Sequence, residues 1–292
     1  MSSPAQLLVE ELWSAARKNF PERVKLLVEH GADVNTPGFR DGRTPYEAAL
    51  LAGNHEIAAY LLQHGAKKIG LDPKETFAAA CIAGRRAEAR ALLEADPGLL
   101  NELGLHGRVE LVHRAVEARR PEGVRLLAEL GFELGGMTRN TPMHNAAWAG
   151  DLEMVELLVE LGADPNLREP TYHATPLGWA AHNQQPHVVR YLLSFATALD
   201  AVQNDGLERA RALLEEDPSL ANTTDDDGNP LVFYLHGGLK RLDEMIELLL
   251  THGAALNLRN KQGRTILDEA LKRGDDDLAN VLRRHGAKTA PP

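Results

Sequence analysis

The sequence predicts an all-α protein, a solenoid of about nine stacked helix-turn-helix repeats. Ten-residue segments related to TPMHNAAWAG recur through the 292 residues, and a second apolar run follows each one. Both runs have the i, i+3, i+4 apolar spacing of amphipathic helices. The recurring segments begin at residues 44, 75, 110, 141, 175, 196, 229 and 265, and one more occupies 11–20. A period of about 33 residues indicates a solenoid, because neither helix can bury its stripe without neighbouring copies.

Within one repeat, the ends of both helices have recognisable signals. Thr141 is expected to be an N-cap, and Pro142 follows at the first helical position, where a missing N–H costs nothing. Gly162 is expected to follow the second helix in the left-handed conformation. Histidines at 30, 64, 252 and 285 each precede such a glycine, and a helix C-terminus favours positive charge there.

Motifs in the loops and first helices resemble the ankyrin repeat. They are GADVN at 31–35, GRTPYEAAL at 42–50, TPMHNAA at 141–147 and GADPN at 162–166. The resemblance covers residues 6–288, and the order of motifs is similar to that of uncharacterised bacterial ankyrin-repeat proteins. It implies β-hairpin-like loops between the helix pairs and a curved array with a concave face. It also implies that His113 and His144 form hydrogen bonds with backbone in the neighbouring loop.

One step of the array is too short. Only 21 residues separate the starts at 175 and 196, and no loop of the GADVN type lies between them. We therefore expect an irregular break near 194–200 that tilts the stack or opens a groove. The predicted domains are 1–195, a cap and about five repeats, and 196–292, about three repeats including a cap.

Composition excludes several classes of protein. The formal net charge is −10, and residues 151–292 contain 14 Lys and Arg against 23 Asp and Glu. An acidic surface repels phosphate backbones, so nucleic acid is not an expected partner. No apolar stretch approaches a membrane span, and the first residues lack the pattern of a signal peptide. We expect a soluble, cytoplasmic monomer.

Catalytic and metal-binding patterns are absent from the sequence. There is no GxSxG, no GxGxxG and no phosphate-binding loop, and the one cysteine, Cys81, lies on an apolar helix. The twelve histidines do not pair at i, i+4, and the acidic runs at 225–227 and 275–277 lack the spacing of a calcium loop. No cofactor, no metal site and no catalytic residue are therefore predicted, and enzymatic activity is left uncertain.

The repeat register predicts which side chains line the concave groove. The residue after the motif histidine and those after the Ala pair should point into the groove, whereas the Pro, His and Ala positions face the stack. Trp148 and Trp179 come from adjacent repeats and should lie at most about 10 Å apart, the helix packing distance. The predicted binding residues are Arg114, Asn145, Trp148, Tyr172, His173, Trp179, His182, Asn183 and Asp200.

Two functions fit this pattern. The first is a non-catalytic interaction module that binds a protein or peptide in the concave groove, with a basic partner favoured by the acidic second half. Trp, Tyr and Arg commonly carry most of the energy of such interfaces. The alternative is a small-molecule-binding protein or atypical enzyme that uses the same Trp/His/Tyr patch. A closed cavity around the two tryptophans would favour the alternative.

Overall fold

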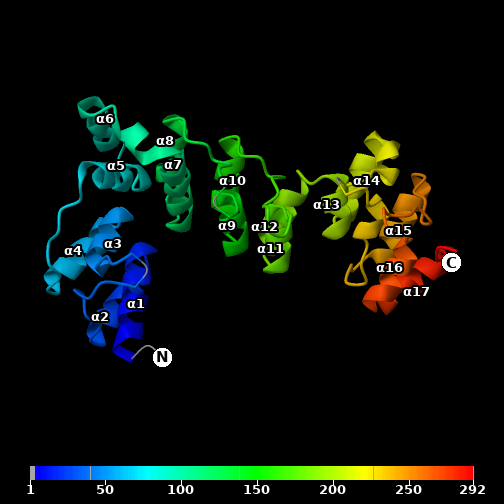
Figure 1. Ribbon diagram of the computed structural model, residues 1–292, viewed down its shortest axis with the longest axis horizontal. Helices are drawn as coiled ribbons and strands as arrows, with labels where there is room; N and C mark the ends of the chain where they lie inside the picture. The colour runs from blue at the N-terminus through cyan, green and yellow to red at the C-terminus, as the bar shows by residue number, and fades with distance from the viewer. Residues whose placement is uncertain (1–3, 40, 138, 226, 292) are drawn as a thin grey trace. The chain divides into compact units, whose positions relative to one another are not determined.

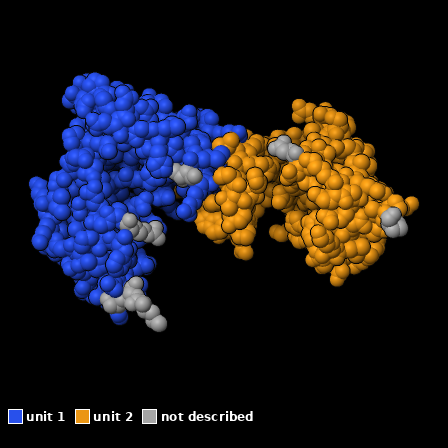
Figure 2. Space-filling view, viewed as in Figure 1, with its two compact units in different colours: residues 1–146, 153–164 blue, residues 147–152, 165–292 orange. Residues whose placement is uncertain are grey.

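The computed structural model describes residues 4–39, 41–137, 139–225 and 227–291. These residues form an array of helix pairs with no β-sheet in the described part of the chain (Figure 1). The chain divides into two compact units, residues 1–146 with 153–164, and residues 147–152 with 165–292 (Figure 2). They are called unit 1 and unit 2 below.

Unit 1 contains four complete helix pairs and most of a fifth. The helices are α1 (Pro4–Arg17), α2 (Pro21–Glu29), α3 (Pro45–Leu51), α4 (His55–Gln63), α5 (Pro73–Ile82), α6 (Arg86–Ala95), α7 (Leu99–Glu117), α8 (Pro121–Glu129), α9 (Pro142–Ala149) and α10 (Leu152–Glu160). The end of α9 and the turn that follows it belong to unit 2. Each of the first four pairs packs helix against helix, and the first helices also contact one another.

Unit 2 continues the same pattern. Its helices are α11 (Pro176–His182), α12 (Pro186–Leu193), α13 (Ala198–Gln203), α14 (Leu207–Glu216), η1 (Pro218–Asn222), η2 (Leu231–Tyr234), α15 (Leu242–Thr251), α16 (Ile266–Arg273) and α17 (Asp276–Arg284). The labels η1 and η2 denote short 3-10 helices. The prediction of an all-α array is confirmed, but the expected boundary at 195/196 lies inside unit 2.

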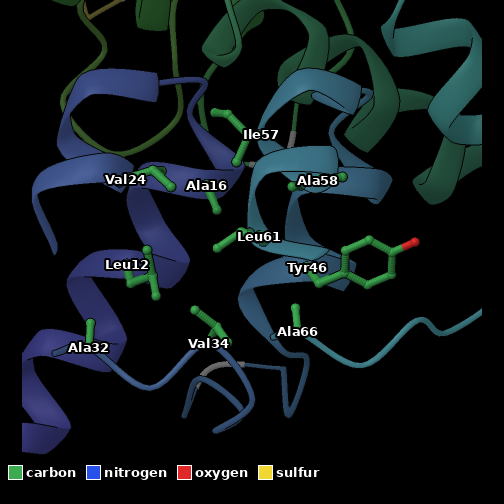
Figure 3. Packing of buried hydrophobic residues seen from close by; sticks show 12 residues of the cluster. Leu12, Ala16, Val24, Ala32, Val34, Tyr46, Ile57, Ala58, Leu61 and Ala66 are labelled. Carbon is green, nitrogen blue, oxygen red and sulfur yellow. The ribbon is translucent and has the colours of Figure 1, made fainter. Parts of the chain in front are cut away.

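The core consists of small and branched side chains at the predicted positions. In the first two helix pairs, Leu12, Val24 and Leu61 are almost fully buried, and Ala16 and Ile57 lie beside them (Figure 3). Alanine on the first helices lets the neighbouring helices approach closely, while the larger side chains of the second helices fill the space between them. Stacking of neighbouring repeats therefore supplies the burial that one helix pair lacks.

The helix ends follow the sequence signals. Helix α9 begins at Pro142, and the Thr141 hydroxyl accepts a hydrogen bond from the His144 N–H at 3.4 Å. Gly162 follows α10 with φ of 89°. Three of the histidines before the glycines contact a carbonyl of the last helical turn, as His64 does with Nδ1 2.8 Å from the Tyr60 oxygen. The fourth, His285, instead lies with Nε2 3.0 Å from the Asp243 carboxylate.

The connecting loops are hairpin-like, as the resemblance implied. Backbone hydrogen bonds close them at Gly38 to Arg43, Glu169 to Ala174, Asp225 to Asn229 and Asn260 to Arg264. The pairing is too short to make strands, and one isolated bridge, Thr224 with Pro230, is the nearest approach to a ladder in the described residues.

Two predicted first helices differ from expectation. The helix expected at 110–119 is joined to an upstream turn in α7, with the path broken at Gly104, which has φ of 62°. The prediction of a helix at 229–238 is wrong, since only the single 3-10 turn η2 forms there. Leu235 is extended, and Gly237 approaches Asp275 so closely that a Cβ would lie 2.3 Å from its carboxylate. The chain therefore leaves the helical path to meet the start of α17.

Gly123→Ala is expected to lower the free energy of unfolding by about 1–3 kcal/mol, although alanine favours helices over glycine. The reason is that a Cβ at Gly123 in α8 would lie 2.2 Å from the backbone oxygen of Ile82 in α5. Gly107→Ala in α7 is the matched control, because its Cβ would meet only ordinary contacts at 3.6 Å. Urea unfolding should show the first variant destabilised and the second unchanged or stabilised; equal stabilisation of both would contradict this packing.

Candidate functional site

Three aromatic side chains of unit 2 form one cluster. The rings of Trp148 and Trp179 lie 5.7 Å apart in an edge-to-face arrangement, with an interplanar angle of 74°. His182 stacks on Trp148 at 5.8 Å and 27°. The sequence placed the two tryptophans within about 10 Å, the helix packing distance, and the structure confirms this. Trp148, Trp179, His182 and Asn183 are called the aromatic patch below.

Local structure explains how the aromatic patch is held. Trp179 and His182 are three residues apart on α11, so their side chains share one face of that helix. Trp148 lies in the last turn of α9, where backbone carbonyls lack helical partners. Asn183 donates from Nδ2 to the Trp148 carbonyl at 2.7 Å, and Gln185 donates from Nε2 to the same oxygen at 3.3 Å.

The aromatic patch is open on one side. Trp148 is 43% exposed, His182 is exposed, and Trp179 is half-buried. Gln185 was not among the predicted residues, because no sequence pattern indicates that its amide reaches the previous repeat. Edge-to-face pairs of this kind contribute about 0.5–1.5 kcal/mol beyond burial, which holds the rings in place without covering them.

The loop before α11 carries Tyr172 and His173. Tyr172 is 78% exposed, and neither ring contacts another aromatic ring among the described residues. These two predicted binding residues therefore take no part in the ring contacts of the aromatic patch. The loop is instead organised by Glu169, which is 1% exposed and whose carboxylate accepts from the N–H groups of Thr171 at 2.6 Å and Tyr172 at 2.8 Å.

Asp200 does not line a groove, and that expectation is wrong. Its side chain is buried, and Arg168 donates from Nη2 to both carboxylate oxygens at 3.0 and 2.9 Å. The Thr197 hydroxyl donates to the same carboxylate at 2.7 Å, and Thr197 is the N-cap of α13. Asp200 thus joins the loop before α11 to the helix after the 21-residue step.

Arg114 and Asn145 belong to unit 1. Arg114 donates from Nη2 to the carbonyl of Leu51 in α3, and burial together with the nearby Arg17 lowers the pKa of its guanidinium. Asn145 accepts from Nδ2 of Asn140 at 2.6 Å, and its own amide nitrogen lies 3.1 Å from Nδ1 of His113. Both side chains form their hydrogen bonds within unit 1, and a shared groove with the aromatic patch stays a prediction.

His113 confirms the role that the resemblance implied. Its Nε2 lies 3.2 Å from the carbonyl of Gly136 in the next loop, so this nitrogen carries the proton and donates. Nδ1 then accepts from Asn145. Burial lowers the pKa of His113 below the ordinary value of 6.5, against the opposing effect of the Gly136 carbonyl. The neutral ring is the form that fits both neighbours.

Acidification is expected to destabilise unit 1 through His113. Because its folded pKa is depressed, the unfolded chain binds more protons as pH falls through about 6.5, and stability is lost by up to about 1.4 kcal/mol per pH unit. Above that pH, His113 is neutral in both the folded and the unfolded chain, and the free energy of unfolding no longer changes with its titration. Urea unfolding at about pH 7.5 and about pH 5.5 should show the loss, and His113→Gln should reduce it. An equal loss in the variant would contradict the assignment.

The cysteine and the acidic side chains give no sign of a catalytic or metal-binding site in the described residues. Burial raises the pKa of the Cys81 thiol to about 12, so it stays protonated at neutral pH. In the described ranges, no three His, Cys, Asp or Glu side chains gather in a geometry that could hold a metal ion. No helix of the described chain is both long and apolar enough to cross a membrane.

Comparison with known proteins fits the repeat geometry. The profile of the family described as "Ankyrin repeats (3 copies)" matches residues 11–72, 76–169, 113–200 and 198–290. The chain belongs to the ankyrin-repeat family. Its ankyrin repeats span both units, including the short step at 175–196, which one match crosses.

Several curated ankyrin-containing proteins are similar over nearly the whole chain. Phosphocholine transferase AnkX of Legionella pneumophila is 25% identical over 281 residues, 91% of this chain and 24% of that protein. E3 ubiquitin-protein ligase KEG of Arabidopsis thaliana is 24% identical, covering 93% of this chain and 19% of the relative. Human transient receptor potential cation channel subfamily A member 1 is 26% identical, covering 95% of this chain and 24% of that protein. The chain thus spans a quarter or less of the length of these relatives.

Proposed function

We propose that this ankyrin-repeat chain is a non-catalytic module that binds a protein or peptide segment, with the aromatic patch as its anchor. Ankyrin repeats are generally protein–protein interaction modules, which gives the class of function. The observation that carries the finer proposal is the 43% exposure of Trp148, although its backbone is fixed by Asn183 and its ring is supported by Trp179 and His182. A rigid, exposed aromatic side chain is the usual anchor of an interface.

The partner surface that fits is apolar at its centre and basic at its edge. Residues 151–292 carry the excess of acidic side chains, so basic residues of a partner would be attracted to this half of the chain. Nucleic acid is disfavoured by the same charge. A cytoplasmic location, a monomeric state and functional domains 1–195 and 196–292 remain predictions.

The alternative is a small-molecule site at the aromatic patch. It would need an enclosed cavity around the two tryptophans, and the exposure of Trp148 and His182 favours an open surface instead. The transferase, ligase and channel names of the relatives describe much longer proteins. Those activities are therefore not proposed for this chain.

Capture of partners from a native lysate tests the proposal. Trp148→Ala/Trp179→Ala is expected to weaken binding of a captured protein by at least about 30-fold, because truncating a hot-spot residue costs about 2 kcal/mol or more. Leu271→Ala is the matched control, since Leu271 in α16 is 41% exposed and lies outside the patch. Circular dichroism should show all three proteins folded.

Two results would contradict the proposal. One is a captured protein that binds the double variant as tightly as the original chain. The other is the absence of any captured protein together with a small molecule that native mass spectrometry finds on the original chain and not on the double variant. The second result would favour the small-molecule alternative.

A further inference from the structure

The single turn η2 leaves space in unit 2 where other repeats have a longer first helix. A cavity of about 280 Å³ is bounded by two successive hairpin-like loops, by the turn η2 and by helix α16. It is called the loop cavity below. Its wall is strongly polar and includes Asp225, Tyr234, Asn260, Gln262, Arg264 and Arg273. Its position is independent of the aromatic patch, so the inference does not rest on the proposed function.

The first carboxylate of the loop cavity is occupied by donors from its own repeat. Asp225 accepts from the Asn229 N–H at 2.7 Å, from Asn229 Nδ2 at 2.8 Å and from the Tyr234 hydroxyl at 2.8 Å. Although burial opposes ionisation, these bonds leave the pKa of Asp225 below its ordinary value. Burial and the Asp225 carboxylate raise the pKa of Tyr234, which therefore stays a donor.

The second carboxylate is occupied by the next repeat. Glu269 of α16 accepts from Nε of Arg264, and Nδ2 of Asn260 lies 3.4 Å from the same oxygen. The other end of the Asn260 amide accepts from the N–H groups of Gln262 at 3.0 Å and Arg264 at 3.1 Å. Both oxygens of Asp225 are thus engaged by groups within the protein, whereas Glu269 is engaged only at Oε1 among the described residues.

Several donors of the loop cavity have no such partner. A guanidinium carries five N–H donors, and Arg264 uses only its Nε among the described residues. The side chains of Arg273 and Gln262 form no hydrogen bond or ion pair with the described part of the chain. Apart from Oε2 of Glu269 and the amide oxygen of Gln262, the groups left to a ligand are donors, and those of Arg264 and Arg273 are cationic.

We propose that the loop cavity binds an anionic group, a carboxylate or a phosphate, through Arg264 and Arg273. Guanidinium groups bind both anions with paired, charge-assisted hydrogen bonds. The cavity is at the small end of ligand sites, whose volumes are about 300–1,000 Å³, so it accommodates one such group with a short stem. The two sources are an acidic peptide side chain and a free or peptide-borne phosphate.

Calorimetry on the full chain tests this site with two probes, inorganic phosphate and an N-acetylated, C-amidated Gly-Glu-Gly peptide. Arg273→Gln is expected to weaken binding by about tenfold or more, the effect of losing a hydrogen bond to a charged group. Arg273 is exposed at the end of α16, so its replacement should not disturb folding. Arg283→Gln in α17 is the matched control and is expected to bind like the original chain.

The outcomes distinguish the two possible anions and also test whether the site exists. Binding of either probe that depends on Arg273 and not on Arg283 supports the site, and the probe that binds tighter identifies the preferred anion. Three results would overturn it: neither probe binds at about 10 mM, binding survives in Arg273→Gln, or Arg283→Gln weakens it equally. The last result would mean that charge alone attracts the probes.

Discussion

Ala147→Asp is expected to lower the free energy of unfolding by at least about 3 kcal/mol, because it buries a carboxylate without a partner. Ala147 in α9 is 0% exposed, and Pro142, His144 and Ala146 on the same helix are buried as well. This is the face that the repeat register assigns to the stack. Neutralising the new carboxyl by protonation would only replace the charge with a buried polar group.

Ala149→Asp is the control for that experiment. Ala149 is exposed and lies two residues further along α9, so the same substitution should change stability by no more than about 0.5 kcal/mol. Urea unfolding followed by circular dichroism compares the two. If both variants unfold at the same urea concentration, the face assigned to the core is wrong.

Arg168→Ala is expected to cost about 1.5–3 kcal/mol, the value of hydrogen bonds to a charged group. Removing this arginine leaves the buried Asp200 carboxylate with no cationic partner, only the Thr197 hydroxyl. This ion pair spans the step that lacks a hairpin loop. Its loss should therefore lower the local stability of segment 194–200. We expect protease cleavage within 194–200 to appear in the variant before it appears in the original chain.

Asp200→Asn separates the ion pair from the cap. The asparagine side chain keeps an acceptor for Thr197 but loses the charge that Arg168 binds. In a double-mutant cycle, the effects of Arg168→Ala and Asp200→Asn should then be clearly non-additive. Additive effects, or a segment 194–200 that resists protease equally in every variant, would count against a structural role for this pair.

The repeat register predicted most of the fold because each repeat carries its own local signals. Thr141, Pro142 and Gly162 occupy the expected ends of their helices, and the buried alanines face the stack. The turn at 231–234 was not predicted, since its apolar pattern resembles a helix. In place of the helix, Gly237 approaches Asp275 and donates to its carboxylate, a contact between residues far apart in the sequence.

The candidate site was predicted less completely. The closeness of Trp148 and Trp179 follows from their equivalent positions in adjacent repeats, so the sequence alone located it. Asp200 was misassigned although Thr197 precedes it at capping spacing, a signal that favours a structural carboxylate. Its pairing with Arg168 could not be predicted, because the missing loop changes which residues meet across that step.

The most direct test of the proposed function is whether a captured partner covers the aromatic patch. Acrylamide quenching of tryptophan fluorescence reports this, because Trp13 is 4% exposed and Trp148 is 43% exposed. Binding of the partner should reduce quenching of the original chain to the level that Trp13 alone gives in the double variant Trp148→Ala/Trp179→Ala. A partner that binds fully while quenching stays unchanged would place the interface elsewhere on the chain.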